Sequence, residues 1–169
     1  MKVAQKLLSL GKQARSGIKF SKPLQRIVIH WIGPFPNQAV STPWNWWENG
    51  SDGKGIQASA HYILKDADII QCVPLDEVAW HSGDARNQDS IGIEVIPMNA
   101  QGEFSRFTID ALKLLVQHIR KETGKQLPLE RHFDGAQKKD CPKFYTPLSE
   151  IANGQERWEN LKLFLNSSI

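Results

Sequence analysis

One stretch of the sequence limits the possible folds more than any other, residues 26–32, which read Arg-Ile-Val-Ile-His-Trp-Ile. Its apolar residues occupy both sets of alternating positions, and most of them are β-branched. A strand with this pattern has to be covered on both of its faces. We therefore expect a central strand inside a layered α/β domain.

Three further strands are expected along the chain. Residues 58–64 and 69–73 are separated by the charged turn Lys-Asp-Ala-Asp and predict an antiparallel hairpin. Residues 90–97 predict a fourth strand, which its final proline ends. Together these segments predict one mixed sheet of about five or six strands, flanked by helices.

Three helices complete the expected domain. A short one begins at Thr42 and stops before Gly50, and a last one runs from about residue 155 to residue 165. The clearest helix has Thr108 as its cap and ends at Gly124. Its apolar residues recur at helical spacing: Leu112, Leu115, Val116 and Ile119.

Basic residues gather at the start of the chain. Residues 1–26 hold seven Lys and Arg residues and no acid, although the whole chain has a net charge of only +3. We divide the chain into a basic leader, residues 1–15, and one domain, residues 16–169. Such a leader either attracts anionic polymers or lies on the domain as a solvated, partly helical segment, and we assign it no specific partner.

Several classes of protein are excluded by length and composition. A chain of 169 residues can bury one core and has little room for a second domain. It has no run long enough for a membrane helix and no signal peptide, so we expect synthesis in the cytoplasm. Two cysteines are too few for a disulfide scaffold; Cys72 is expected as a small buried residue, and a disulfide to Cys141 stays possible.

A histidine and a cysteine near the end of the chain predict a metal site. His132 and Cys141 lie nine residues apart in a loop rich in Gly, Asp and Lys, which can fold both side chains onto one point. Imidazole and thiolate are donors that zinc prefers. His30, in the central strand, would complete three protein ligands and leave the fourth position to a water that the metal makes acidic.

Two charged residues are candidates for proton transfer and charge stabilisation. Glu94 interrupts an apolar strand, so its carboxylate either points to solvent or is functional. Lys139 lies two residues before Cys141, where its ammonium can stabilise a developing oxyanion. The competing chemistry is direct attack by Cys141, which we rank lower because no oxyanion loop is visible near it.

The motifs that carry these residues, taken in order, resemble the type-2 N-acetylmuramoyl-L-alanine amidases over roughly residues 16–147. They are Ile-Val-Ile-His30-Trp, Ala-Ser-Ala-His61-Tyr, Glu-Val-Ala-Trp-His81, Ser-Ile-Gly-Ile-Glu94 and His132 followed by Lys139-Asp-Cys141-Pro. The resemblance is greatest to phage endolysins and bacterial autolysins, with peptidoglycan recognition proteins as more distant relatives. It implies hydrolysis of the amide between muramic acid and L-alanine.

The resemblance also implies a role for each site residue. Two histidines and the Cys-Pro cysteine bind one zinc ion, matching His30, His132 and Cys141, while Glu94 and Lys139 act in catalysis. We further expect His81 and His61 to bind substrate. The catalytic tyrosine of distant relatives is replaced by Ala60, and we expect the Trp cluster at residues 44–47 to be buried rather than to stack on sugar.

Bacterial peptidoglycan is therefore the expected partner, with no nucleic acid, no separate wall-binding domain and a monomer as the default. We expect the enzyme to reach the wall after release from the cell. Two alternatives stay open. A cytoplasmic recycling amidase usually has aspartate as its third ligand, and a non-catalytic recognition module usually lacks the ligand cysteine, so Cys141 argues against both.

Overall fold

The computed structural model describes residues 2–33 and 36–168 and contains one sheet with three helices. The strands are β1 (Ala4–Gln5), β2 (Arg26–Trp31), β3 (Tyr62–Lys65), β4 (Asp68–Gln71), β5 (Ser90–Val95) and β6 (Leu129–Arg131). The helices are α1 (Ser41–Asn49), α2 (Arg106–Thr123) and α3 (Gly154–Asn166), and short 3₁₀ turns span Ala85–Gln88, His132–Asp134 and Lys143–Tyr145. The predicted α/β class with a mixed sheet is confirmed.

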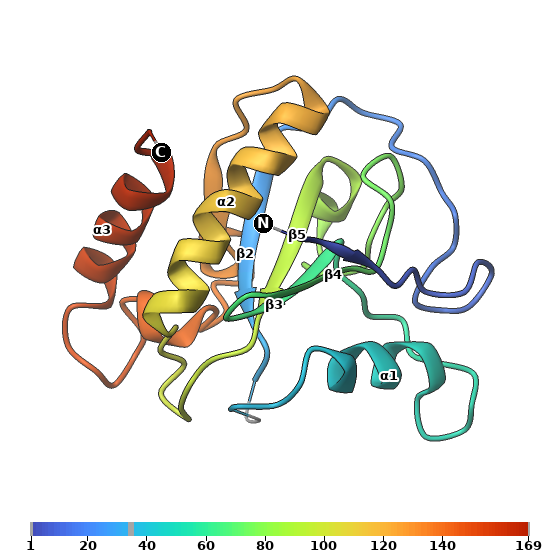
Figure 1. Cartoon of the computed structure of the whole chain (residues 1–169), viewed down its shortest axis with the longest axis horizontal. Coiled ribbons are helices and arrows are strands. Elements are labelled where there is room, and N and C mark those ends of the chain that lie inside the picture. The colour runs from blue at the N-terminus through green and yellow to red at the C-terminus, as the bar shows by residue number, and fades with distance from the viewer. Residues whose placement is uncertain (1, 34–35, 169) are drawn as a thin grey trace.

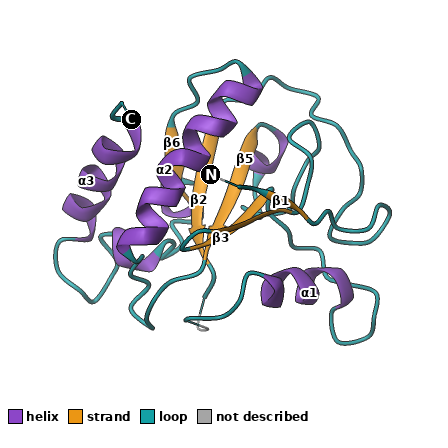
Figure 2. Ribbon diagram, viewed as in Figure 1, coloured by secondary structure: helices purple, strands orange, loops and turns teal. Residues whose placement is uncertain are grey.

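The sheet has the strand order β1-β4-β3-β5-β2-β6 (Figure 2). Only β3 and β4 pair in antiparallel fashion, as the charged turn between them predicted, and every other neighbouring pair is parallel. Strand β2 lies between β5 and β6, so the apolar segment at residues 26–31 is a central strand, as expected. The sequence did not reveal β1 or β6, which have only two and three residues.

Each face of the sheet is covered by a separate apolar cluster. Helices α2 and α3 lie together over one face, and α1 lies apart from them (Figure 1). The first cluster joins Ile29 and Ile93 to α2 and α3, and the second joins Ile63 and Ile70 to Trp47 of α1. Side chains alternate along a strand, so His30 points to the face opposite Ile29.

The ends of α2 match the prediction at one terminus only. Gly124 adopts the left-handed conformation that a side chain would disfavour, and its N–H donates to the carbonyl groups of Arg120 and Lys121. The helix begins three residues earlier than expected, because the N-cap is Ser105 rather than Thr108. The Ser105 hydroxyl accepts a hydrogen bond from the backbone N–H of Thr108. Thr108, the predicted N-cap, therefore lies in the first turn and is itself capped by Ser105.

The first fifteen residues are held against the rest of the chain. β1 pairs with β4, and no helix occurs between residues 2 and 33. Leu8 is completely buried, and Arg15 forms a bidentate ion pair with Glu77 at 2.8 and 3.0 Å. Lys12 also pairs with Glu48 of the domain body. These contacts favour a segment that lies on the domain over an arm free to attract polyanions.

The structure tests the burial expected for the Trp cluster at residues 44–47 and for Cys72. Trp47 is buried as expected, whereas Trp46 is 51% exposed, so the expectation of a buried cluster is wrong for Trp46. Cys72 is fully buried, as predicted, and both it and Cys141 are free thiols.

Among the helices that the structure describes, none has both the length and the apolar character needed to cross a bilayer.

Replacing Leu8 with Ala is expected to lower the free energy of unfolding by about 2–5 kcal/mol, because it leaves a cavity in the second apolar cluster. Leu10→Ala is the matched control, since Leu10 is 68% exposed and its loss should change stability by less than about 0.5 kcal/mol. Urea unfolding followed by circular dichroism measures both. Equal stabilities of the two variants would show that the N-terminal segment is not part of the folded unit.

Candidate functional site

Three neighbouring parallel strands bring the candidate residues to one edge of the sheet. His30 pairs in register with Glu94 on β5, so both side chains leave the same face. Arg131, the last residue of β6, pairs with Ile29, which sets the residue that follows β6, His132, beside His30. All three residues lie at the carboxyl ends of their strands, where open α/β sheets bind ligands.

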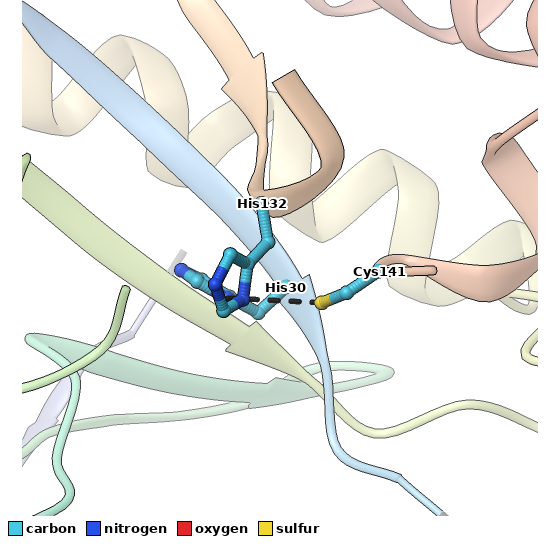
Figure 3. Close-up of side chains that lie close together, drawn as sticks. All are labelled: His30, His132 and Cys141. Carbon is cyan, nitrogen blue, oxygen red and sulfur yellow. Dashed lines mark hydrogen bonds between the residues drawn. The ribbon is translucent and has the colours of Figure 1, made fainter. Parts of the chain in front are cut away.

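Cys141 completes the cluster from a loop that returns to the 3₁₀ turn after β6. The backbone N–H of Phe133 donates to the carbonyl oxygen of Cys141 at 2.9 Å and closes this loop. Figure 3 shows His30, His132 and Cys141 turned toward one another. The Nδ1 atoms of the two histidines are 3.1 Å apart, and Cys141 Sγ is 3.8 Å from His30 Nδ1. The donor atoms of all three residues lie within 4.8 Å of one another.

Burial sets the charge of the two histidines in this cluster. Burial, helped by the positive charge of Lys139, lowers the pKa of His132 to about 4. Burial also lowers the pKa of His30 well below its ordinary value. Both rings are therefore neutral near pH 7, which is the form that binds a metal ion.

The setting of Cys141 favours a metal ligand over a free nucleophile. Burial and the negative charge of Glu94 raise the pKa of its thiol. A thiol with a raised pKa is a weak nucleophile at neutral pH, so direct attack by Cys141 is disfavoured. Two imidazole nitrogens and one sulfur at these separations fit zinc, and a cation between them would stabilise the thiolate.

Glu94 is half-buried beside the cluster, and its Oε2 atom is covered and has no hydrogen-bond partner among the described residues. Burial raises its pKa well above the ordinary value. A carboxyl group with a raised pKa can take up and release a proton near neutral pH. Lys139 is exposed, and its positive charge reaches both His30 and His132.

A cavity of about 660 Å³ extends from Glu94 toward α1. Its lining is mainly apolar and includes Trp31, Ile32, Gly33, Gln38, Thr42, Pro43, Trp46 and Trp47. The exposed side of Trp46 therefore borders a hollow that reaches the candidate catalytic carboxylate. The position of Trp46 at the border of this cavity accounts for its exposure, which helical periodicity alone did not predict.

His61 and His81 are both buried near the cluster. The Nδ1 atom of His61 accepts the N–H of Gly92 at 3.0 Å, and its Nε2 atom contacts the carbonyl oxygen of Glu77 at 2.9 Å. His81 contacts His30 and Ser90 through its two ring nitrogens, at 3.0 and 3.2 Å. These contacts favour structural positions over the predicted role in substrate binding, because each ring nitrogen already has a partner.

No feature of the sequence indicated which residues hold the histidines in place. His132 Nε2 donates to the carbonyl oxygen of Ser82 at 2.8 Å, which leaves Nδ1 free to face the cluster. The buried guanidinium of Arg86 donates to the carbonyl oxygens of Arg131 and His132 at 3.1 and 3.0 Å. Residues 82–90 are mainly polar and contain Gly, Asp and Asn, a pattern typical of an exposed loop, so the burial of Ser82, Arg86, Asn87 and Ser90 was not predictable.

Three protein donors at the carboxyl edge of a mixed α/β sheet define a candidate catalytic metal centre, since structural zinc sites usually have four protein ligands. The chain belongs to the Amidase_2 family, N-acetylmuramoyl-L-alanine amidase, whose model matches residues 20–144. The family resemblance that the motifs predicted is confirmed. The matched range contains every residue of the cluster.

Known proteins agree with this assignment. N-acetylmuramoyl-L-alanine amidase CwlH of Bacillus subtilis (strain 168) is 39% identical over 77 residues, which are 43% of this chain and 29% of that protein. The chain spans between 22% and 58% of the length of the curated relatives it matches.

Solved structures show the same fold. The match to the structure of PlyL has a TM-score of 0.77 at 18% identity and covers 99% of this chain and 98% of the PlyL chain. The match to a mutant endolysin from Bacillus subtilis has a TM-score of 0.72 at 23% identity and covers 97% of this chain and 98% of the endolysin chain.

Acid is expected to destabilise the metal-free protein through its buried histidines. Burial lowers the pKa of His61 from 6.5 to about 4, so at pH 5 the unfolded chain binds a proton that the folded chain excludes. Between pH 7 and pH 5 this ring alone should lower the free energy of unfolding by about 2 kcal/mol. Asp84, with a pKa lowered to about 2, acts only at more acidic pH.

Urea unfolding in the presence of a chelator measures this dependence. His61→Gln should reduce the loss of stability between pH 7 and pH 5, whereas His118→Gln should leave it unchanged, because the His118 side chain is 35% exposed. A parent protein with the same stability at both pH values would contradict the expectation.

Proposed function

We propose that this protein hydrolyses the amide bond between N-acetylmuramic acid and L-alanine in peptidoglycan. The observation that carries the proposal is the convergence of His30, His132 and Cys141 beside Glu94, in a chain of the Amidase_2 family. His30, His132 and Cys141 would hold one zinc ion. When bound there, zinc would lower the pKa of a water molecule and make it a nucleophile near neutral pH.

The residues of the chain account for each proton and charge in the reaction. Glu94 accepts a proton from the attacking water, whose oxygen adds to the carbonyl carbon of the lactyl group. The ammonium group of Lys139 stabilises the negative charge that develops on the carbonyl oxygen. Glu94 then donates its proton to the nitrogen of L-alanine as the carbon–nitrogen bond breaks, which restores the carboxylate.

The cavity beside Glu94 supports a substrate larger than a single amide. Its apolar lining and the exposed part of Trp46 can cover one side of a bound muropeptide while the scissile bond faces Glu94. The likeness to the fold of a Bacillus subtilis endolysin supports a role in lysis of the bacterial wall. We accordingly propose an endolysin or autolysin activity.

Digestion of purified peptidoglycan with mass analysis tests the bond that is cut. Free stem peptides with L-alanine at their N-terminus are expected. A recognition module would bind the polymer and release no peptide, and a recycling amidase would cleave soluble muropeptides but leave intact wall uncut. Either result would overturn the proposal.

The metal assignment predicts close to one zinc ion per chain and a difference between the two cysteines. Cys141→Ser should weaken zinc binding at least about 10-fold, since it removes the thiolate donor. Cys72→Ser is the matched control, because this thiol is also buried but lies outside the cluster, and it should keep the metal. Metal analysis after dialysis against a chelator measures both. Full zinc content in Cys141→Ser would show that Cys141 is not a ligand.

Glu94→Gln is expected to keep zinc and to lower kcat by about 10²–10⁴-fold, because an amide cannot transfer the proton. Glu156→Gln, at an exposed position of α3, should leave turnover unchanged. Release of stem peptides over time measures kcat, and metal analysis is run on the same samples. Normal turnover by Glu94→Gln would assign the proton transfer to another group.

A further inference from the structure

His81 links the candidate ligand His30 to a hydroxyl group inside the sheet. His81 Nδ1 is 3.0 Å from His30 Nε2, and His81 Nε2 is 3.2 Å from Ser90 Oγ. The Ser90 hydroxyl in turn contacts the carbonyl oxygen of Arg86. His81 is only 7% exposed and Ser90 is fully buried, so water does not compete for these contacts.

The direction of each hydrogen bond in this series follows from its last acceptor, the carbonyl oxygen of Arg86. A carbonyl oxygen can only accept, so the Ser90 hydroxyl has to donate its proton to Arg86. Ser90 Oγ can then only accept from His81, which places the His81 proton on Nε2 and leaves Nδ1 as an acceptor. His81 Nδ1 therefore accepts from His30 Nε2, and the lone pair of His30 lies on Nδ1, the atom that faces His132 and Cys141.

The sheet leaves a fitted space for the His81 ring. A Cβ atom added to Gly92 would lie 2.4 Å from Cγ and 2.6 Å from Cδ2 of His81. Glycine at this position of β5 thus lets the ring lie directly against the strand, between His30 and Ser90. This packing fixes the ring independently of its hydrogen bonds.

We propose that His81 is a positioning residue, which holds His30 in the tautomer that presents Nδ1 to a metal ion. Ser90 sets the direction of the hydrogen bonds that link these residues. This inference rests on the metal site of the proposed function and adds two residues to it, one of which the sequence assigned to substrate. Loss of a residue that orients a metal-binding histidine typically weakens metal affinity by about 10–100-fold.

A pair of variants with the same shape tests the proposal. Asn and Leu branch alike, but only Asn retains an oxygen that can accept from His30 Nε2. His81→Leu should weaken zinc affinity by about 10–100-fold, whereas His81→Asn should stay within about threefold of the parent. His118→Leu controls for the loss of a histidine away from the cluster and should bind zinc as the parent does. Competition with a chromophoric chelator gives the zinc dissociation constants.

Nuclear magnetic resonance of the metal-free parent provides a readout that does not depend on any variant folding. Imidazole ¹⁵N shifts should show His30 protonated at Nε2 and unprotonated at Nδ1. In Ser90→Ala, which keeps the fold if its circular dichroism matches the parent, this preference should weaken. A His30 proton on Nδ1 in the parent would overturn the proposal.

Equal zinc affinities for His81→Leu and His81→Asn would also overturn it, because they would reduce His81 to a packing residue. These outcomes are separate from the test of the reaction. A protein that releases no stem peptides but shows the difference between Leu and Asn would refute the proposed function and support the role of His81.

Discussion

The parallel pairing of β2 with β5 and β6 is the constraint on which the site depends. It sets His30 beside Glu94 and, one residue beyond the last pair with β6, beside His132. Because side chains alternate along a strand, a slip of one residue would turn His30 toward the face covered by α2 and α3. The apolar residues that precede His30 oppose such a slip, since it would move Ile27 and Ile29 out of the first apolar cluster.

A polar segment, residues 81–90, then fixes the orientation of the side chains that the sheet brings together. Its buried residues are His81, Ser82, Arg86, Asn87 and Ser90. Ser82 accepts from His132, His81 contacts His30, and Arg86 donates to the carbonyl oxygen of His132. The segment is itself held by Asn87, whose side-chain oxygen accepts from the backbone of His81 and Ser82. Buried polar groups are costly unless they are paired, so these hydrogen bonds favour one arrangement of the site.

Much of the fold could be predicted because its signals are local. The apolar segment at residues 26–31, the hairpin and the helical spacing from Leu112 to Ile119 each appear within one window of sequence. The signals that failed depend on distant partners. β6 has only three residues and forms because it can pair with β2. The exposure of Trp46 depends on where α1 packs against the sheet. The same holds for the N-terminal segment, whose Arg15 finds Glu77 sixty-two positions away.

By itself, the sequence determined the chemistry available to the protein: two imidazoles, one thiol, one carboxylate and one ammonium, carried by motifs of a single family. Residue type and local spacing are enough to identify such donors. Only the tertiary structure decided that the donor atoms share one point, that one carboxylate oxygen of Glu94 is covered, and that His81 contacts a histidine instead of facing solvent. Distances, burial and hydrogen-bond direction arise from contacts between segments far apart in the chain, and no local pattern encodes them.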